Sequence, residues 1–146
     1  MKRSTFLVLS LVVFGLIGGC HRGTGSLPIP GTVTGTLQQG DSVLQDGSAY
    51  DDHTVWLTAG SPVTIVVRGG PSTSSPGSNL DVYTFLMRNG AEVTHDDDSA
   101  GNFNSRIIFT PTQTGMYTIR VNTYGGGLKT GAYTIQTWQG AHPEAA

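Results

Sequence analysis

Residues 105–122, SRIIFTPTQTGMYTIRVN, contain the pattern that decides the fold class. Two runs within it alternate apolar with mostly polar residues, and the turn-forming segment PTQTG separates them. The apolar positions are Ile107, Phe109, Tyr117, Ile119 and Val121. A period of two, with Thr and Arg on the other side, is typical of antiparallel strands that turn one face to water. The stretch therefore predicts two strands joined by a turn.

The same period continues on both sides of this stretch. It occurs in residues 53–58, 63–68 and 133–138, and breaker-rich segments such as GGPSTSSPGSN at 69–79 separate the runs. No window has a helical period. Seven or eight short strands at this spacing predict an all-β fold, an antiparallel, jelly-roll-like β-sandwich.

One hairpin can be assigned a register. Asn89-Gly90 is the strongest two-residue type I′ turn signal, because both positions need positive φ. Arg88 and Ala91 then flank the turn. Counting outward, Leu86 is expected to face Val93, and Asp81 to face Asp98 where the hairpin opens.

The acidic segment HDDDSAGNFN, residues 95–104, allows two interpretations. Adjacent aspartates repel one another unless a cation or fixed dipoles compensate. Oxygen ligands from Asp81, Asp97 and Asp98 suit Ca²⁺, although the spacing does not match an EF-hand. The alternative is a solvated turn in which Asp and Asn side chains cap their own backbone. The sequence leaves both open.

Other polar and aromatic residues give weaker signals. Asp51-Asp52-His53 lacks the spacing of a zinc site, and His53 is expected to be a half-buried strand residue. No nucleophile elbow, P-loop or dinucleotide motif occurs, so no catalytic residue is assigned and no enzyme activity is expected. Trp56 and Tyr124 are candidate ligand-binding aromatics. Trp56 is either exposed or covered by residues 69–79.

The N-terminal residues predict export and a lipid anchor. Lys2 and Arg3 precede the apolar run FLVLSLVVFGLI at 6–17, which is short for a membrane-spanning helix. Ile-Gly-Gly-Cys at 17–20 resembles the lipobox of bacterial lipoprotein precursors, in which the cysteine is lipidated and becomes the first residue. Cys20 is the only cysteine, so it cannot form an internal disulfide. An ordinary signal peptide with an incidental cysteine is the alternative.

The composition of the remaining chain excludes one class of partner. Without Lys2 and Arg3, six of the eight basic residues remain against ten acidic ones, a formal net charge of −4. The basic residues are scattered singly, whereas nucleic-acid binding needs clustered cations. We expect a signal peptide at 1–19, a tether at 20–31, a β-sandwich domain at 32–139 and a tail at 140–146.

Several motifs, taken in order, resemble the bacterial pre-peptidase C-terminal domain. They are GSAYDDHTVWLTAG at 47–60, LDVY at 80–83, NG at 89–90, DDS at 97–99, SRI at 105–107, TGMYTIRV at 114–121 and GAYTI at 131–135. The resemblance implies a small jelly-roll-like sandwich. Members usually follow the catalytic domain of secreted proteases and assist secretion or bind substrate, and some bind Ca²⁺. Here we expect a lipid anchor in the place of a catalytic domain before the matching segment.

These observations together predict a non-catalytic surface lipoprotein. Its domain is expected to act as a binding or adhesion module for extracellular protein or polysaccharide. Its membrane contact is expected to be the N-terminal lipid, in the outer membrane of a bacterial envelope. The alternative is a structural or assembly-related envelope lipoprotein with a protein partner, stabilised by calcium.

Overall fold

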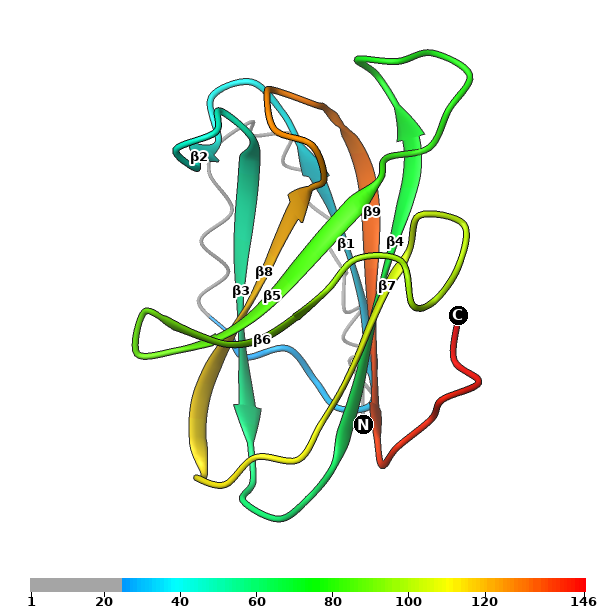
Figure 1. Cartoon of the computed structure of the whole chain (residues 1–146). Coiled ribbons are helices and arrows are strands. Elements are labelled where there is room, and N and C mark those ends of the chain that lie inside the picture. Colours follow the sequence, from blue (N-terminus) through cyan, green and yellow to red (C-terminus); the bar gives the residue numbers. More distant parts are fainter. Residues whose placement is uncertain (1–24) are drawn as a thin grey trace, which may run out of the picture.

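Two antiparallel sheets packed face to face make up the architecture (Figure 1). The computed structural model describes residues 25–146. Its strands are β1 (Gly31–Leu37), β2 (Ser42–Val43), β3 (Ala49–Leu57), β4 (Val63–Ser72), β5 (Val82–Arg88), β6 (Ala91–Asp96), β7 (Ser105–Phe109), β8 (Gly115–Thr123) and β9 (Gly131–Gln139). One sheet has the order β1-β9-β4-β7 and the other β2-β3-β8-β5-β6. The predicted all-β antiparallel sandwich is confirmed, with two-residue β2 raising the strand number to nine.

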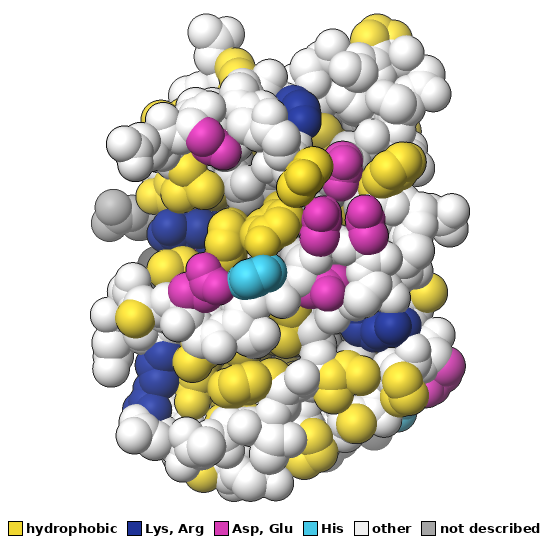
Figure 2. All heavy atoms as spheres, viewed as in Figure 1, with side chains coloured by type: hydrophobic (Ala, Val, Ile, Leu, Met, Phe, Trp, Pro, Cys, Tyr) yellow, Lys and Arg dark blue, Asp and Glu magenta, His cyan; other side chains and the backbone are white. Residues whose placement is uncertain are grey.

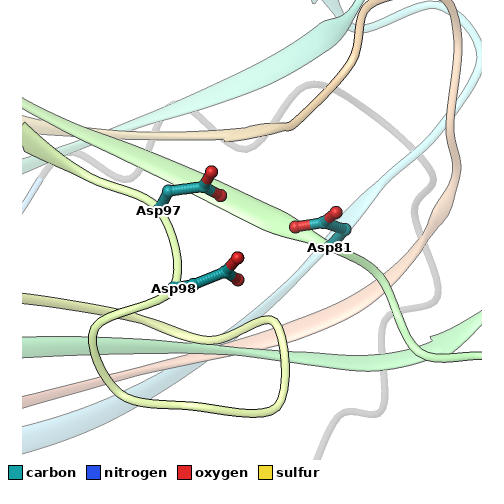
Figure 3. A group of neighbouring side chains, drawn as sticks. All are labelled: Asp81, Asp97 and Asp98. Atoms are coloured by element: carbon teal, nitrogen blue, oxygen red, sulfur yellow. The ribbon is translucent and has the colours of Figure 1, made fainter.

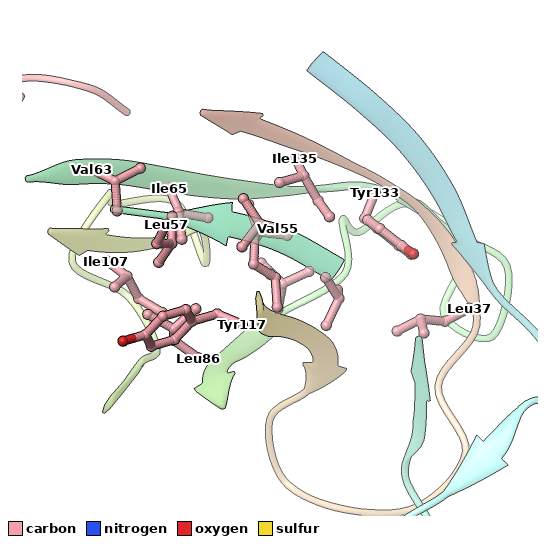
Figure 4. Packing of buried hydrophobic residues seen from close by; sticks show 14 of the residues in the cluster. Leu37, Val55, Leu57, Val63, Ile65, Leu86, Ile107, Tyr117, Tyr133 and Ile135 are labelled. Atoms are coloured by element: carbon pink, nitrogen blue, oxygen red, sulfur yellow. The ribbon is translucent and has the colours of Figure 1, made fainter. Parts of the chain in front are cut away.

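The core lies between the sheets, and the period-two pattern builds it (Figure 4). Alternate residues of facing strands point inward, because successive side chains of a strand lie on opposite faces. The buried side chains include Val55, Leu57, Val63, Ile65, Leu86, Ile107, Tyr117, Ile119, Val121, Tyr133 and Ile135. Apart from Leu86, in a hairpin for which the sequence pattern did not say which face is buried, each lies on the face that the alternation predicts to be apolar. The five-stranded sheet therefore keeps its other face open to solvent.

The register expected for the β5–β6 hairpin is wrong beyond its first pairs. Arg88 pairs with Ala91 and Met87 with Glu92, as the Asn89-Gly90 turn requires. Leu86 then pairs with Thr94 instead of Val93, because Val93 is an extra, unpaired residue in a β-bulge. Bulges are common in edge strands such as β6. Every pair beyond the bulge is shifted by one, and β6 ends at Asp96, before any pairing of Asp81 with Asp98.

Both ends of the described chain pack against the sandwich. Leu27 and Ile29, in the segment expected to be a tether, contact the core cluster. At the other end, the backbone N–H of His142 donates to Thr64 Oγ1, which donates to the carbonyl of Gly140. This segment covers part of the outer face of β4, where Thr64 is fully buried. The outer face of the four-stranded sheet is therefore less open than the alternation predicts.

The residues with which the sequence predicts a lipid anchor lie outside the described part. These are the signal segment 1–19 and Cys20, and the structure describes the chain from residue 25. Among residues 25–146, no helix has the length and apolarity needed to cross a membrane. The anchor remains a prediction from the sequence.

Candidate functional site

Three aspartates converge where the β5–β6 hairpin opens. Asp81 immediately precedes β5, and Asp97 and Asp98 immediately follow β6. One carboxylate oxygen from each lies within 4.8 Å of the other two. Figure 3 shows the carboxylates of Asp97 and Asp98 directed toward that of Asp81 from the facing segment. The three residues meet although the register that predicted their meeting is wrong, because the chain after β6 turns back beside the start of β5.

The turn after β6 is capped by a different aspartate. Asp96 Oδ2 accepts the backbone N–H groups of Ser99 and Arg106, at 3.1 and 2.8 Å. The Oδ1 atoms of Asp81 and Asp97 are buried and have no hydrogen-bond partner within the described chain. Backbone capping was the alternative interpretation of this segment. It explains the role of Asp96, but it does not explain why Asp81, Asp97 and Asp98 lie together.

Electrostatics make this group unfavourable on its own. Burial, followed by the charge of Asp98, raises the pKa of Asp81 above its usual value. Burial, followed by the charges of Asp98 and Asp81, likewise raises the pKa of Asp97. Lys129 is the cation that opposes the shift at Asp81. A cation among the three carboxylates would remove the mutual repulsion.

The geometry of the group fits a calcium ion. Ca²⁺ takes six to eight oxygen ligands at about 2.3–2.6 Å, so ligand oxygens around one ion lie within about 5 Å of one another. The 4.8 Å limit found for Asp81, Asp97 and Asp98 meets this condition. The two buried oxygens without partners are the atoms that an ion would satisfy. Three carboxylates leave the remaining ligand positions to water or backbone carbonyls.

A row of aromatic rings borders the carboxylates on the open face of the sheet. The ring of Tyr83 lies 4.9 Å from Phe85, 5.4 Å from His95 and 6.3 Å from Tyr124, measured between centroids. The planes of Tyr124 and His95 lie within 25° of Tyr83. Figure 2 shows a hydrophobic group on this face, with a histidine at its edge and acidic side chains beside it.

Tyr124 joins the aromatic row to the acidic group. Its backbone N–H donates to the carbonyl of Asp81 at 3.0 Å, and 53% of its surface is exposed. Tyr83 and Phe85 were not predicted as site residues. They could have been found, because Asp81, Tyr83 and Phe85 alternate with buried Val82, Thr84 and Leu86 along one strand.

Trp56 lies at the other end of the same sheet. It is 56% exposed, so of the two expectations for this residue the exposed one is correct. It pairs with Met116 in the β3–β8 register, whereas Tyr124 follows the opposite end of β8. Trp56 and Tyr124, predicted together as binding aromatics, therefore do not form one surface.

Asp51 and His53 belong to a hydrogen-bonded group in the interior. Tyr133 on β9 donates its hydroxyl to Asp51 Oδ2 at 2.6 Å, and its oxygen lies 2.6 Å from His53 Nε2. Because the hydroxyl proton goes to Asp51, His53 Nε2 is the donor to Tyr133. Burial lowers the pKa of His53, and the charges of Asp51 and Asp52 oppose that shift. The group links the two sheets and agrees with the half-buried role expected for His53.

Asp52 and Tyr50 point to the outer face and are bound to one cation. Arg120 donates from Nε and Nη2 to the two carboxylate oxygens of Asp52, both at 2.7 Å. Its guanidinium carbon lies 3.8 Å from the ring centre of Tyr50. This bidentate pair and cation–π contact account for these residues as parts of the sheet surface.

Comparison with known proteins gives a family and a fold. The family described as the bacterial pre-peptidase C-terminal domain matches residues 49–123, which is just over half of the chain. Among solved structures, the chain is similar to the pre-peptidase C-terminal domain of a collagenase from Bacillus anthracis. That match has 17% identity and a TM-score of 0.50, and it covers 75% of this chain and 89% of that one. No curated protein matches. The chain belongs to the bacterial pre-peptidase C-terminal domain family.

Proposed function

We propose that this protein is a non-catalytic binding module, held on the outer membrane by a lipid on Cys20. Its ligand is an extracellular polysaccharide or protein, bound at the acidic–aromatic face. That face consists of Asp81, Asp97, Asp98, Tyr83, Phe85, His95 and Tyr124. The observation that carries the proposal is the convergence of three carboxylates beside a row of nearly parallel rings. Domains of this family are non-catalytic parts of peptidases, which is consistent with a binding-type module.

The chemistry of the face favours a polysaccharide as the first ligand to test. Aromatic rings offer flat apolar surfaces, and tyrosine adds a hydroxyl at the rim. Burial raises the pKa of Tyr83, with Glu92 the next cause, so its hydroxyl stays protonated at neutral pH. Sugar rings have apolar faces that suit such a platform, and their hydroxyls suit carboxylate oxygens or a calcium ion. A protein ligand would use the same rings with a basic side chain near the carboxylates.

Calcium is part of the proposal. Asp81, Asp97 and Asp98 would hold the ion, and the ion would neutralise the group and offer open positions to ligand hydroxyls. The ion would also tie the start of β5 to the segment after β6, which no strand pairing joins. Ligand binding is therefore expected to weaken when calcium is chelated.

Binding measurements on variants test the site. The mature protein would be titrated with a panel of soluble polysaccharides and with extracellular matrix proteins, in millimolar Ca²⁺ and in EGTA. Tyr124→Ala should weaken binding about tenfold, equivalent to about 1.4 kcal/mol. Trp56→Ala removes an equally exposed aromatic at the other end of the sheet and should leave the affinity unchanged. Equal affinities for wild type and Tyr124→Ala would contradict the assignment of this face.

A separate experiment tests the anchor. Cys20→Ser should release the protein from membranes and leave the signal segment processed differently, because two or three acyl chains supply the membrane affinity. Mass spectrometry of the wild-type N-terminus would identify the lipid. Protease treatment of intact cells should remove the domain if it faces outward, whereas full protection would favour the assembly role inside the envelope.

A further inference from the structure

Trp56 and Met116 form an exposed apolar pair that the core does not explain. They lie opposite each other in the β3–β8 register and are 56% and 45% exposed. Both point away from the core, since their neighbours Val55, Leu57 and Tyr117 are buried. We refer to this pair, with the loops at 58–62 and 110–114, as the Trp56 end. The two loops lie together at the bottom of Figure 1.

Charge is absent from the segments that build this end. Residues 54–67 and 107–119 contain no Asp, Glu, Lys or Arg. A cation reaches it from β5: Arg88 donates to the side chain of Gln113, and its guanidinium carbon lies 5.3 Å from the ring centre of Tyr117. The acidic residue Glu144 lies outside these two segments, in the C-terminal segment, and its Oε1 is 3.1 Å from Nδ1 of His142. The Trp56 end thus combines an exposed indole, a thioether and one nearby guanidinium.

The N-terminal segment is fastened directly beside this end. The backbone N–H of Trp56 donates to Ser26 Oγ at 2.9 Å, and the N–H of Leu27 donates to the carbonyl of Thr54 at 2.8 Å. Five peptide units separate Gly25 from Cys20 in the sequence. Even fully extended, that length spans at most about 18 Å. A lipid on Cys20 would therefore hold this edge of the domain close to the bilayer.

The acidic–aromatic face lies at the opposite end of the sheet. Tyr124, the residue after β8, comes eight residues after Met116, which corresponds to about 26 Å at the rise of a strand. An anionic bilayer repels the carboxylates of Asp81, Asp97 and Asp98. Tryptophan, by contrast, is enriched at membrane–water interfaces, where its ring is buried and its N–H stays hydrated.

We propose that the Trp56 end is a membrane-contacting surface, with Trp56 and Met116 inserted among the lipid headgroups. The inference rests on the lipid anchor proposed above and adds an orientation to it. The short link sets the distance, and the exposed apolar pair, with the Arg88 guanidinium nearby, sets which side turns to the bilayer. The acidic–aromatic face then points away from the membrane, toward a ligand outside.

Tryptophan fluorescence tests this orientation, because the chain has two tryptophans, Trp56 and Trp138. Protein purified from membranes would be reconstituted in vesicles of phosphatidylcholine and phosphatidylglycerol, with and without brominated acyl chains. Trp138→Phe leaves Trp56 as the emitter, and Trp56→Phe is the matched control. Brominated lipid should quench Trp56 more strongly than Trp138, which pairs with Thr64 at the same end of the sandwich but lies on the other sheet. Acrylamide quenching of Trp56 should be roughly twofold lower than in the soluble Cys20→Ser protein.

Each outcome separates the orientation from the anchor. A lipidated, vesicle-bound protein in which Trp56 stays open to acrylamide and untouched by brominated lipid would overturn the orientation alone. A protein that carries no lipid and does not bind vesicles would overturn both proposals. If Trp138→Phe does not fold, the difference in quenching between wild type and Trp56→Phe gives the same information.

Discussion

The two ends of the five-stranded sheet share strand β8 and have opposite chemistry. At one end, Asp81, Asp97 and Asp98 converge beside Tyr83 and Tyr124. At the other, Trp56 and Met116 are exposed among uncharged loops. The inward-facing residues follow one pattern along the whole sheet. The difference shows that the core pattern determines the sandwich, whereas the outward residues and the loops determine what each end can bind.

The two ends also differ in the space around one glycine at each end. Behind the acidic group, Gly69 N–H donates to Asn104 Oδ1 at 3.1 Å, and Leu80 N–H donates to the carbonyl of Gly70 at 2.9 Å. A Cβ atom on Gly69 would lie 1.9 Å from the carbonyl oxygen of Leu80. At the Trp56 end, Gly60 has open space around its Cβ position. The acidic end therefore has a close backbone approach at Gly69 that Gly60 does not have at the other end.

The largest expected effect is a test of this packing difference. Gly69→Ala should lower the free energy of unfolding by about 3 kcal/mol, the upper range for overpacking, because the Leu80 backbone must move. Gly60→Ala should cost about 1 kcal/mol, since only its positive φ of 75° opposes the side chain. Urea unfolding measures both. Equal costs would remove the distinction between the two ends.

Calcium is expected to stabilise the protein by binding at the acidic end alone. If Ca²⁺ binds only the folded state, it should add about 2.7 kcal/mol to stability at a hundredfold excess over Kd. Melting in Ca²⁺ and in EGTA measures the shift for wild type, Asp81→Asn and Asp98→Asn. Both substitutions should reduce it, and Glu92→Gln, a charge loss elsewhere on this face, should not. A shift that survives both substitutions would place the ion elsewhere, and no shift in wild type would leave the carboxylates without an ion.

Without calcium, Asp98→Asn should have the opposite effect on stability. Burial, and then the charge of Asp98, raise the pKa values of Asp81 and Asp97. Asp98→Asn removes the second of these causes, so in EGTA it should stabilise the protein. The gain should be about 1 kcal/mol or less, the repulsion of one pair at 4 Å in water. Glu92→Gln should bring no gain, since Glu92 contacts His95 at 2.6 Å. Destabilisation by Asp98→Asn in EGTA would show that its carboxylate is held by favourable contacts.

The smallest expected effect concerns the interior between the two ends. The pKa of His53 is lowered by burial, so the unfolded chain takes up a proton there at a higher pH than the folded protein. Its contribution to stability is present above about pH 6.5 and is lost as the pH falls below that value. The pKa of Asp51 is raised, mainly by burial. Its contribution to stability therefore has the opposite pH dependence: it is present at acid pH and is lost as the pH rises through the raised pKa.

Thermal melting from pH 8 to pH 5 measures the His53 contribution. His53→Asn should flatten the loss of stability near pH 6, and Trp56→Ala should leave the profile unchanged. His142, whose pKa is raised by its contacts with Gln139 and Glu144, contributes in the other direction, so His142→Asn is the matched control. A His53→Asn profile parallel to that of wild type would contradict the shift.

Particular residues separate what could be predicted from what could not. The alternation at Val55, Leu57, Tyr117, Ile119 and Val121 correctly predicted the buried face. The Asn89-Gly90 turn correctly predicted its flanking pairs, but the extra residue Val93 shifted the remaining pairs by one. The spacing of apolar residues carries no signal for such a bulge, because Val93 on an edge strand is exposed in any case.

The candidate site also has features that could be predicted from the sequence and features that could not. The hairpin register counted from Asn89-Gly90 predicted that Asp81 meets Asp98, with Asp97 beside it. That register is wrong beyond the bulge, yet the structure brings one carboxylate oxygen of each of the three within 4.8 Å of the others. The separation of Trp56 from Tyr124 could not be predicted, because it depends on the pairing of β3 with β8. The partnership of His53 with Tyr133, 80 residues apart, likewise depends on how the two sheets face each other.

Local chemistry therefore decided the class of fold, the turns and the candidate residues of this protein. Those features depend on neighbours along the chain, where a period of two and the φ preferences of Asn and Gly act directly. Which strands pair, where a bulge shifts the register and which outward residues share an end depend on contacts between distant segments. They are selected by packing two whole sheets against each other, and only the folded chain contains that information.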